Sequence, residues 1–134
     1  MDPKALYTKL KHYFSNKPDL MRHLHTNACW EYNIYHNSLK EQTFKLRYYL
    51  FKKDENILKI TQKKADFVPD LILYFTEEAI LQLIQDNPAS ELYYQRYHKM
   101  MNDISKDKVD SKVNKSRFNL LRLGYQKWQK DFKF

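Results

Sequence analysis

The chain has 134 residues and a formal net charge of +8 at pH 7, and 43% of its residues are hydrophobic and 16% aromatic. This length suits one domain over residues 1–134, and so much apolar side chain excludes a disordered composition. A single glycine, Gly124, excludes a P-loop and a dinucleotide-binding fingerprint, because both need several glycines at turn positions. A single cysteine, Cys29, excludes an internal disulfide and favours a reducing compartment.

The N-terminal segment predicts two helical pieces. Asp2 is a good N-cap, and Pro3 fits the first helical turn, where its missing N–H costs nothing. Apolar residues then recur at helical spacing as far as Phe14, and Pro18 starts a shorter helical piece. The segment is charged throughout, unlike a signal peptide, and the chain has no run of about 18 apolar residues that would span a membrane. We therefore expect a cytoplasmic protein.

The next part of the chain has the patterns of strands. Residues 30–35 and 44–51 alternate between an apolar face and a partly polar one. Residues 53–56 are typical of a turn, which would join the second strand to a hairpin partner over 57–62. An unbroken apolar run over 71–75 predicts a more deeply buried strand.

The second half of the chain is predicted to be mostly helical. Thr76 is an N-cap for a helix with an apolar face that ends near Ile84, and Asn87-Pro88 opens another helix. The polar stretch 105–116 indicates a loop or a weak helical turn, and a last helix covers 117–132. This order of elements predicts an α+β fold, with an antiparallel or mixed sheet of about four to five strands and helices packed on one face.

These elements resemble the sterol-carrier-protein type-two (lipid-transfer) domain family. The resemblance rests on a strand at ACWEYNIYH, a hairpin at TFKLRYYLFKKDENILKI, and a strand, LILYF, that runs directly into the helix TEEAILQLI. The residues Lys63–Asp66, the Asn87-Pro88 junction and the closing helix RFNLLRLGYQKWQKDF also match the order of the family. The family commonly has a glycine-rich hairpin and a further short strand after the Asn-Pro junction, and the chain departs from it at both points.

The resemblance implies an apolar tunnel between the sheet and the helices. It would hold a fatty acid, an acyl-coenzyme A, a sterol or an isoprenoid, and it would need no cofactor, no metal and no catalytic residues. Apolar residues of the predicted strands and helices are the candidate lining, although each would serve equally well in an ordinary core. The candidates are Phe44, Leu46, Leu73, Phe75, Ile80, Leu83, Ile84, Tyr97, Met100, Met101, Leu121 and Tyr125.

Positive charge is concentrated at the C-terminal end, where nine basic residues face three acidic ones from Ser105 to Phe134. The predicted closing helix carries an apolar stripe between lysines and arginines. This pattern is typical of an interfacial membrane helix, but equally of a helix packed on the core with a solvated basic face. We expect this helix to act as a lid and as a docking surface on anionic membranes. The predicted docking residues are Arg122, Lys127, Trp128, Lys130 and Phe132.

Two other classes of function stay open. A basic protein rich in tyrosine could bind nucleic acid through phosphate contacts and base stacking, although the chain has no DNA- or RNA-binding motif. Domains of the resembled family also act as accessory or dimerising parts, so a separate partner enzyme or a homodimer is a further alternative. Nothing favours an enzyme, because the histidines are scattered and helix-start electrostatics explain Glu77 and Glu78.

Overall fold

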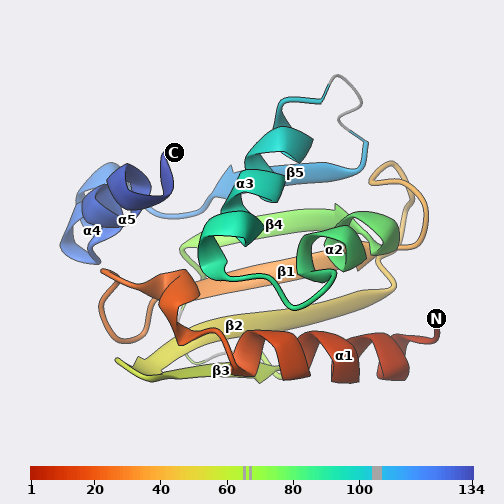
Figure 1. Cartoon of the computed structure of the whole chain (residues 1–134), viewed down its shortest axis with the longest axis horizontal. Helices are drawn as coiled ribbons and strands as arrows, with labels where there is room; N and C mark the ends of the chain where they lie inside the picture. The colour runs from red at the N-terminus through yellow and green to blue at the C-terminus, as the bar shows by residue number, and fades with distance from the viewer. Residues whose placement is uncertain (65, 67, 104–106) are drawn as a thin grey trace.

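A five-stranded mixed sheet forms the centre of the computed structural model, which describes residues 1–64, 66, 68–103 and 107–134 (Figure 1). The strand order is β3-β2-β1-β4-β5, in which β1 and β4 are parallel and the other neighbours are antiparallel. The strands are β1 (Cys29–Tyr35), β2 (Leu46–Asp54), β3 (Ile57–Thr61), β4 (Leu71–Thr76) and β5 (Val109–Val113). The predicted α+β fold with a sheet of four to five strands is confirmed.

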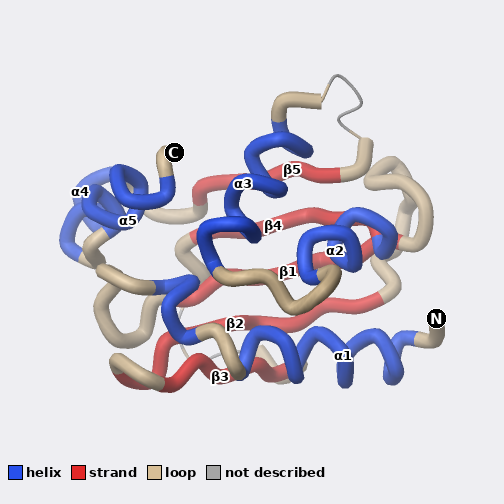
Figure 2. Tube along the Cα trace, in the orientation of Figure 1, coloured by secondary structure: helices blue, strands red, loops and turns tan. Residues whose placement is uncertain are grey.

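Three helices lie over one face of this sheet, and two more lie beside one end of it (Figures 1 and 2). The three are α1 (Pro3–Ser15), α2 (Glu77–Ile84) and α3 (Ser90–Met101), and a 3-10 helix, η1 (Pro18–Met21), follows α1. The two at the end are α4 (Arg117–Arg122) and α5 (Tyr125–Phe132). No helix of the described residues is long and apolar enough to cross a membrane.

The alternation in the sequence explains which side chains face the helices. Trp30, Tyr32 and Ile34 of β1 point to the helical side, and the residues paired with them on β2 and β4 do the same. Tyr32 stacks on Tyr48 of β2 at a centroid distance of 4.7 Å, and both rings are fully buried. The core between sheet and helices is therefore largely aromatic.

The helix starts follow the predicted caps at two of three places. Asp2 accepts the N–H of Ala5 at 2.9 Å, and Thr76 accepts the N–H of Ala79 at 3.2 Å. The third helix begins at Ser90 rather than at the Asn87-Pro88 pair. Asn87 instead adopts a left-handed conformation, with φ at 51°, and serves the turn between α2 and α3.

The polar stretch predicted as a loop contains an edge strand, β5. Only Val109 of its five residues is buried, so the apolar signal on which strand prediction depends is missing. Polar and charged side chains are common on edge strands, where they discourage pairing with other chains. Residues 104–106 lie outside the described residues, as does Ala65 of the Lys63–Asp66 match. They include Ile104, which the apolar spacing places at the end of the helix expected after Asn87-Pro88.

The predicted closing helix is broken into α4 and α5 at Gly124. Gly124 has a φ of 93°, which suits glycine, and a Cβ there would lie 2.2 Å from the carbonyl oxygen of His23. The N–H of His25 also donates to the carbonyl oxygen of Leu123 at 2.9 Å. The helix is therefore interrupted at Gly124 because the backbone of residues 23–25, after η1, packs directly against it.

We predict that Gly124→Ala lowers the free energy of unfolding by at least about 1 kcal/mol, because the new methyl group meets both a left-handed backbone and the His23 carbonyl. The exposed Gln126→Ala in α5 is the control and should change it by less than about 0.5 kcal/mol. Urea denaturation measures both. Equal stability of the two variants would contradict the close approach.

Candidate functional site

An apolar cavity of about 150 Å³, here called the inner pocket, lies between the sheet, α3 and α5. Most of its lining side chains are aromatic, and β1, β4, β5, α3, α5 and the C-terminal residue all contribute. The lining residues are Trp30, Tyr32, Leu71, Leu73, Tyr93, Tyr94, Tyr97, Ser111, Val113, Trp128, Gln129 and Phe134.

Several aromatic residues of the inner pocket use their polar atoms outside it. The Trp128 indole N–H and the Tyr94 hydroxyl both donate to the carbonyl oxygen of Leu20, at 3.0 and 2.8 Å. The Trp30 indole N–H donates to the Tyr125 hydroxyl at 2.8 Å. Because these hydrogen bonds fix the edges of the rings, the pocket is left with ring surface suited to an apolar partner.

A second hollow, here called the outer groove, adjoins the inner pocket beside β5, α4 and α5. Its volume is about 450 Å³, and it shares Leu71, Val113, Trp128 and Gln129 with the inner pocket. Further along, it is lined by residues that include Leu120 and the cations of Lys115 and Arg117. The two hollows together give a path from an aromatic end to a basic end.

A buried carboxylate holds the walls of this path together. Asp70, just before β4, is fully buried, and its Oδ2 accepts the N–H of Cys29 at 3.0 Å and the hydroxyl of Tyr125 at 2.6 Å. The ammonium of Lys115 lies 2.6 Å from Oδ1. Asp70 thus joins β1, β4, α5 and the segment after β5.

The groups around Asp70 are poorly suited to catalysis. Burial, with a further contribution from the Asp70 carboxylate, raises the pKa of the Cys29 thiol to about 12, so the thiol stays protonated near neutral pH. Burial and Asp70 also raise the pKa of the Tyr125 hydroxyl well above its ordinary value of 10.0. No cluster of three histidine, cysteine, aspartate or glutamate side chains that could hold a metal ion occurs among the described residues.

The helix α5 covers one side of the inner pocket and is fastened at its far end. Asp131 accepts hydrogen bonds from Arg22 at 2.5 Å and from His23 at 2.9 Å, and these bonds lower the pKa of its carboxyl group. Phe134 stacks on Trp128 at a centroid distance of 4.5 Å. The C-terminal segment therefore forms a roof over the pocket.

The structure brings only some of the predicted lining residues to these hollows. Leu73 and Tyr97 line the inner pocket, and Leu121 and Tyr125 line the outer groove. Most of the others pack into the core, either buried or partly buried against it. These are Leu46, Phe75, Ile80, Leu83, Ile84, Met100 and Met101.

Phe44 was predicted to face inward in the second strand, and this is wrong. The strand begins at Leu46, and Phe44 precedes it with 41% of its surface exposed. Its ring instead packs against the guanidinium of Arg47 at 4.1 Å. The apolar alternation in the sequence starts two residues before β2 begins. The pattern therefore assigned Phe44 to the strand, although the strand starts at Leu46.

The predicted docking residues divide by exposure. Trp128 and Phe132 are buried, because the apolar stripe of α5 packs against Tyr94 of α3. They cannot contact a membrane while α5 is in this position. Arg122, Lys127 and Lys130 are exposed.

Sequence reasoning missed most of the inner pocket, although part of the signal was present. The strand alternation already placed Trp30 and Tyr32 on the helical face of β1. Tyr93, Tyr94 and Tyr97 fall within one turn of α3, but three neighbouring tyrosines are as typical of a core as of a pocket. No pattern in the sequence indicated that Phe134 folds back onto Trp128.

Comparisons with known proteins support the fold. No family model matches the chain, and no curated protein matches its sequence. A solved structure described as "UbiJ-SCP2 Ubiquinone synthesis protein" is similar to it, with a TM-score of 0.52 and 10% sequence identity, over 98% of this chain and 90% of that one. The chain therefore has a sterol-carrier-protein type-two-like fold, and the resemblance inferred from its sequence is confirmed at the level of fold.

We predict that Asp70→Ala destabilises the protein by about 3 kcal/mol, because the Cys29 N–H and the Tyr125 hydroxyl lose their acceptor and Lys115 loses its ion-pair partner. Hydrogen exchange should then increase first over residues 115–134. Asp110→Ala, on the exposed side of β5, is the control and should leave that exchange unchanged. Uniform faster exchange across the whole chain would argue against a specific tether.

A second prediction concerns alkaline pH. Burial raises the pKa of Tyr32, Tyr93 and Tyr94 well above 10.0, whereas in the unfolded chain these hydroxyls ionise near pH 10. The stability that this difference contributes is fully present below about pH 10 and is lost as the pH rises above it. The urea midpoint should therefore be flat between about pH 8 and 9 and fall beyond about pH 10. A urea midpoint that stays unchanged as the pH rises well above 10 would contradict the burial.

Proposed function

We propose that this protein binds an apolar lipid without catalysis, with the inner pocket as the most apolar part of its site. The observation that carries this proposal is the lining of that pocket, in which aromatic and aliphatic side chains predominate and Ser111 and Gln129 supply the few polar groups. Sites for apolar ligands have this composition. Burial of the ligand's apolar surface would drive binding, at roughly 25 cal/mol per Å².

The volume of the inner pocket limits what enters it. A cavity of about 150 Å³ is large enough for a benzene-sized group, whereas pockets for larger ligands usually measure roughly 300–1,000 Å³. A fatty acid, acyl-coenzyme A, sterol or isoprenoid would therefore place one end in the inner pocket and continue along the outer groove. The basic side chains of Lys115 and Arg117 would face a polar or anionic head at the groove end.

Among these ligands, an isoprenoid with a ring is our first choice. Ring faces of Trp30, Trp128 and the α3 tyrosines suit a flat or unsaturated group better than they suit a saturated chain. The similar solved structure is described as a ubiquinone synthesis protein, and the unsaturated tail of an isoprenoid quinone would suit this lining while its polar ring lies toward the basic end of the groove. Delivery of such a ligand to a separate partner enzyme would fit the same site.

The C-terminal segment is proposed to act as the lid. Movement of the roof formed by α5 and Phe134 would widen the inner pocket for a longer ligand, and its fastenings at Asp131 lie on the surface. Exchange would take place at an anionic membrane, to which the basic C-terminal segment is attracted. Nucleic-acid binding is less well supported, because the rings that would stack on bases are mostly buried.

Native mass spectrometry of the purified protein, followed by organic extraction, tests the proposal directly. A stoichiometric lipid, lost on denaturation, is the expected result. A ligand-free mass together with no uptake of a fluorescent fatty acid or of a short-chain quinone would contradict it.

We predict that Leu73→Trp weakens lipid uptake at least about tenfold, because the larger side chain fills the inner pocket. The matched control is Ile72→Trp, one residue away on the opposite face of β4, which should bind as the unchanged protein does. Titration with the fluorescent probe measures binding, and thermal denaturation checks that both variants fold. Undiminished uptake by a folded Leu73→Trp protein would show that the lipid does not bind in the inner pocket.

A further inference from the structure

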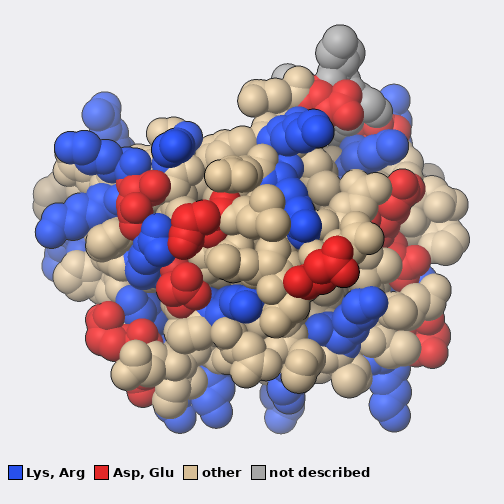
Figure 3. Space-filling model, viewed as in Figure 1, with Lys and Arg blue, Asp and Glu red and all other residues tan. Residues whose placement is uncertain are grey.

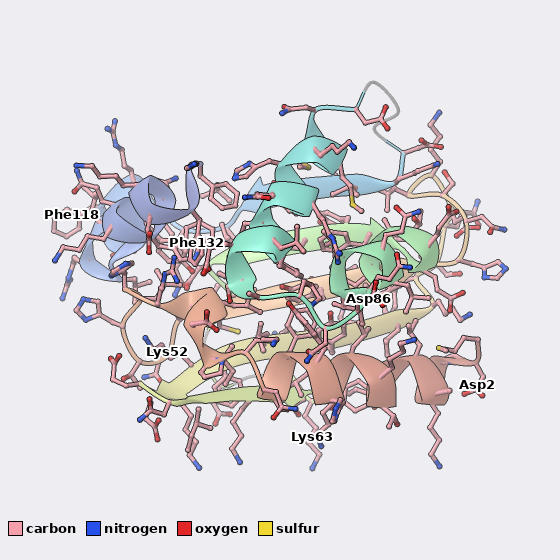
Figure 4. All side chains as sticks on the ribbon, viewed as in Figure 1. Asp2, Lys52, Lys63, Asp86, Phe118 and Phe132 are labelled. Atoms are coloured by element: carbon pink, nitrogen blue, oxygen red, sulfur yellow. The ribbon has the colours of Figure 1, made fainter. Side chains whose placement is uncertain are left out.

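The helix α4 presents apolar side chains to solvent. It has no buried residues, and the exposed fractions of Phe118 and Leu121 are 67% and 49%. Val113, at the near end of β5, is 59% exposed. In Figure 4 Phe118 points outward from α4, whereas Phe132 of α5 points toward α3. This set of three residues is here called the α4 surface.

The chain segment that carries the α4 surface is strongly basic. From Lys112 to Phe134 every charged residue except Asp131 is a lysine or arginine, and Asp131 is engaged by Arg22 and His23. Figure 3 shows lysine and arginine side chains gathered over the α4 and α5 end of the molecule. Within the described part of the chain, neither Arg117 nor Arg122 pairs with a carboxylate, and the guanidinium of Arg122 lies 5.8 Å from the centre of the Phe118 ring.

The α4 surface is held in place from behind rather than by its own packing. Ser116 caps the helix by accepting the N–H of Asn119 at 3.3 Å, Lys115 pairs with buried Asp70, and Leu123 accepts the N–H of His25. An exposed phenylalanine and leucine on a short, well-anchored helix contribute little to the core. Their arrangement needs another explanation.

We propose that the α4 surface docks on an anionic lipid bilayer, with Phe118 and Leu121 inserted at the interface and Arg117 and Arg122 against lipid phosphates. An apolar face with aromatic residues and cationic flanks is the pattern of interfacial membrane binding. The charge argues for this partner, because an acidic bilayer surface attracts such a segment within a Debye length. The apolar anchors are those of α4, and docking does not require the buried stripe of α5 to leave the protein.

The position of α4 gives the docking a further consequence, which rests on the proposed lipid binding. Leu121 and Arg117 belong to the outer groove as well as to the docking face. When α4 lies on the bilayer, the basic end of the groove faces the lipid. A ligand could then pass between the bilayer and the inner pocket without crossing water.

The experiment is sedimentation with vesicles of phosphatidylcholine alone and of phosphatidylcholine mixed with phosphatidylserine. We expect binding to the mixed vesicles only, and at least about tenfold weaker binding by Phe118→Glu. The control is Leu92→Glu, an exposed leucine of α3 whose exposed fraction is 42%, which should bind unchanged. Circular dichroism confirms that both variants fold.

A second pair of variants separates local charge from net charge. Arg117→Gln with Arg122→Gln should weaken vesicle binding, whereas Lys4→Gln with Lys11→Gln, which removes the same charge from exposed positions of α1, should leave it nearly unchanged. Equal effects of the two pairs would show a nonspecific charge effect and overturn the proposal. So would vesicle binding that Phe118→Glu does not alter.

Two further outcomes are distinguishable. Binding of a DNA or RNA oligonucleotide that depends on Arg122, without vesicle binding, would assign the α4 surface to nucleic acid and overturn the membrane proposal. Phe118 lines neither the inner pocket nor the outer groove, so Phe118→Glu should still take up the fluorescent lipid from solution. Vesicle docking in a protein that binds no lipid probe would contradict the proposed function and leave the docking intact.

Discussion

The hydrogen-bonded carboxylate of Asp70 is the contact on which the arrangement of the C-terminal half depends. A buried carboxylate is costly unless it is hydrogen-bonded or paired with a cation. Here the N–H of Cys29 in β1 and the hydroxyl of Tyr125 in α5 donate to Oδ2, and Lys115 after β5 forms an ion pair with Oδ1. These elements are far apart in the sequence, and the network is complete only when all of them are in place. The inner pocket lies among the same elements. The polar network of Asp70, which is not part of the pocket lining, therefore holds the apolar walls of the pocket in position.

The same division between polar edges and apolar faces extends through the aromatic core. Indole and hydroxyl groups of Trp30, Trp128 and Tyr94 are bound to fixed partners, so the rings are held in position before any ligand arrives. A pre-organised lining of this kind lowers the entropic cost of binding. The aromatic-rich composition could not distinguish a core from a pocket, because the same continuous layer of rings forms the core and lines the pocket.

The sequence predicted the order of elements well, because alternation, caps and buried runs are local signals. It failed where distant parts of the chain meet. β5 lacks an apolar face, and the break at Gly124 depends on the carbonyl of His23, which no local pattern reveals. The pocket-lining residues were harder to predict than the fold. Leu73 and Phe75 occupy equivalent positions in the alternation of β4, but Leu73 lines the inner pocket and Phe75 is buried among core rings. Lys52 is the opposite case, a charged residue that local patterns would place at the surface. It is buried in an inward position of β2 because its ammonium donates to the carbonyl oxygens of Met21 and Leu24.

The two tryptophans of the chain are both in the wall of the inner pocket, with ring centroids 5.6 Å apart. The tryptophan fluorescence of the protein therefore originates from this one place. Their tilted rings at this separation exchange excitation, and quenching by a bound chromophore such as a quinone would act on both at once. The molecule thus contains an optical reporter of its own pocket, with no label needed and no background from tryptophan elsewhere in the fold.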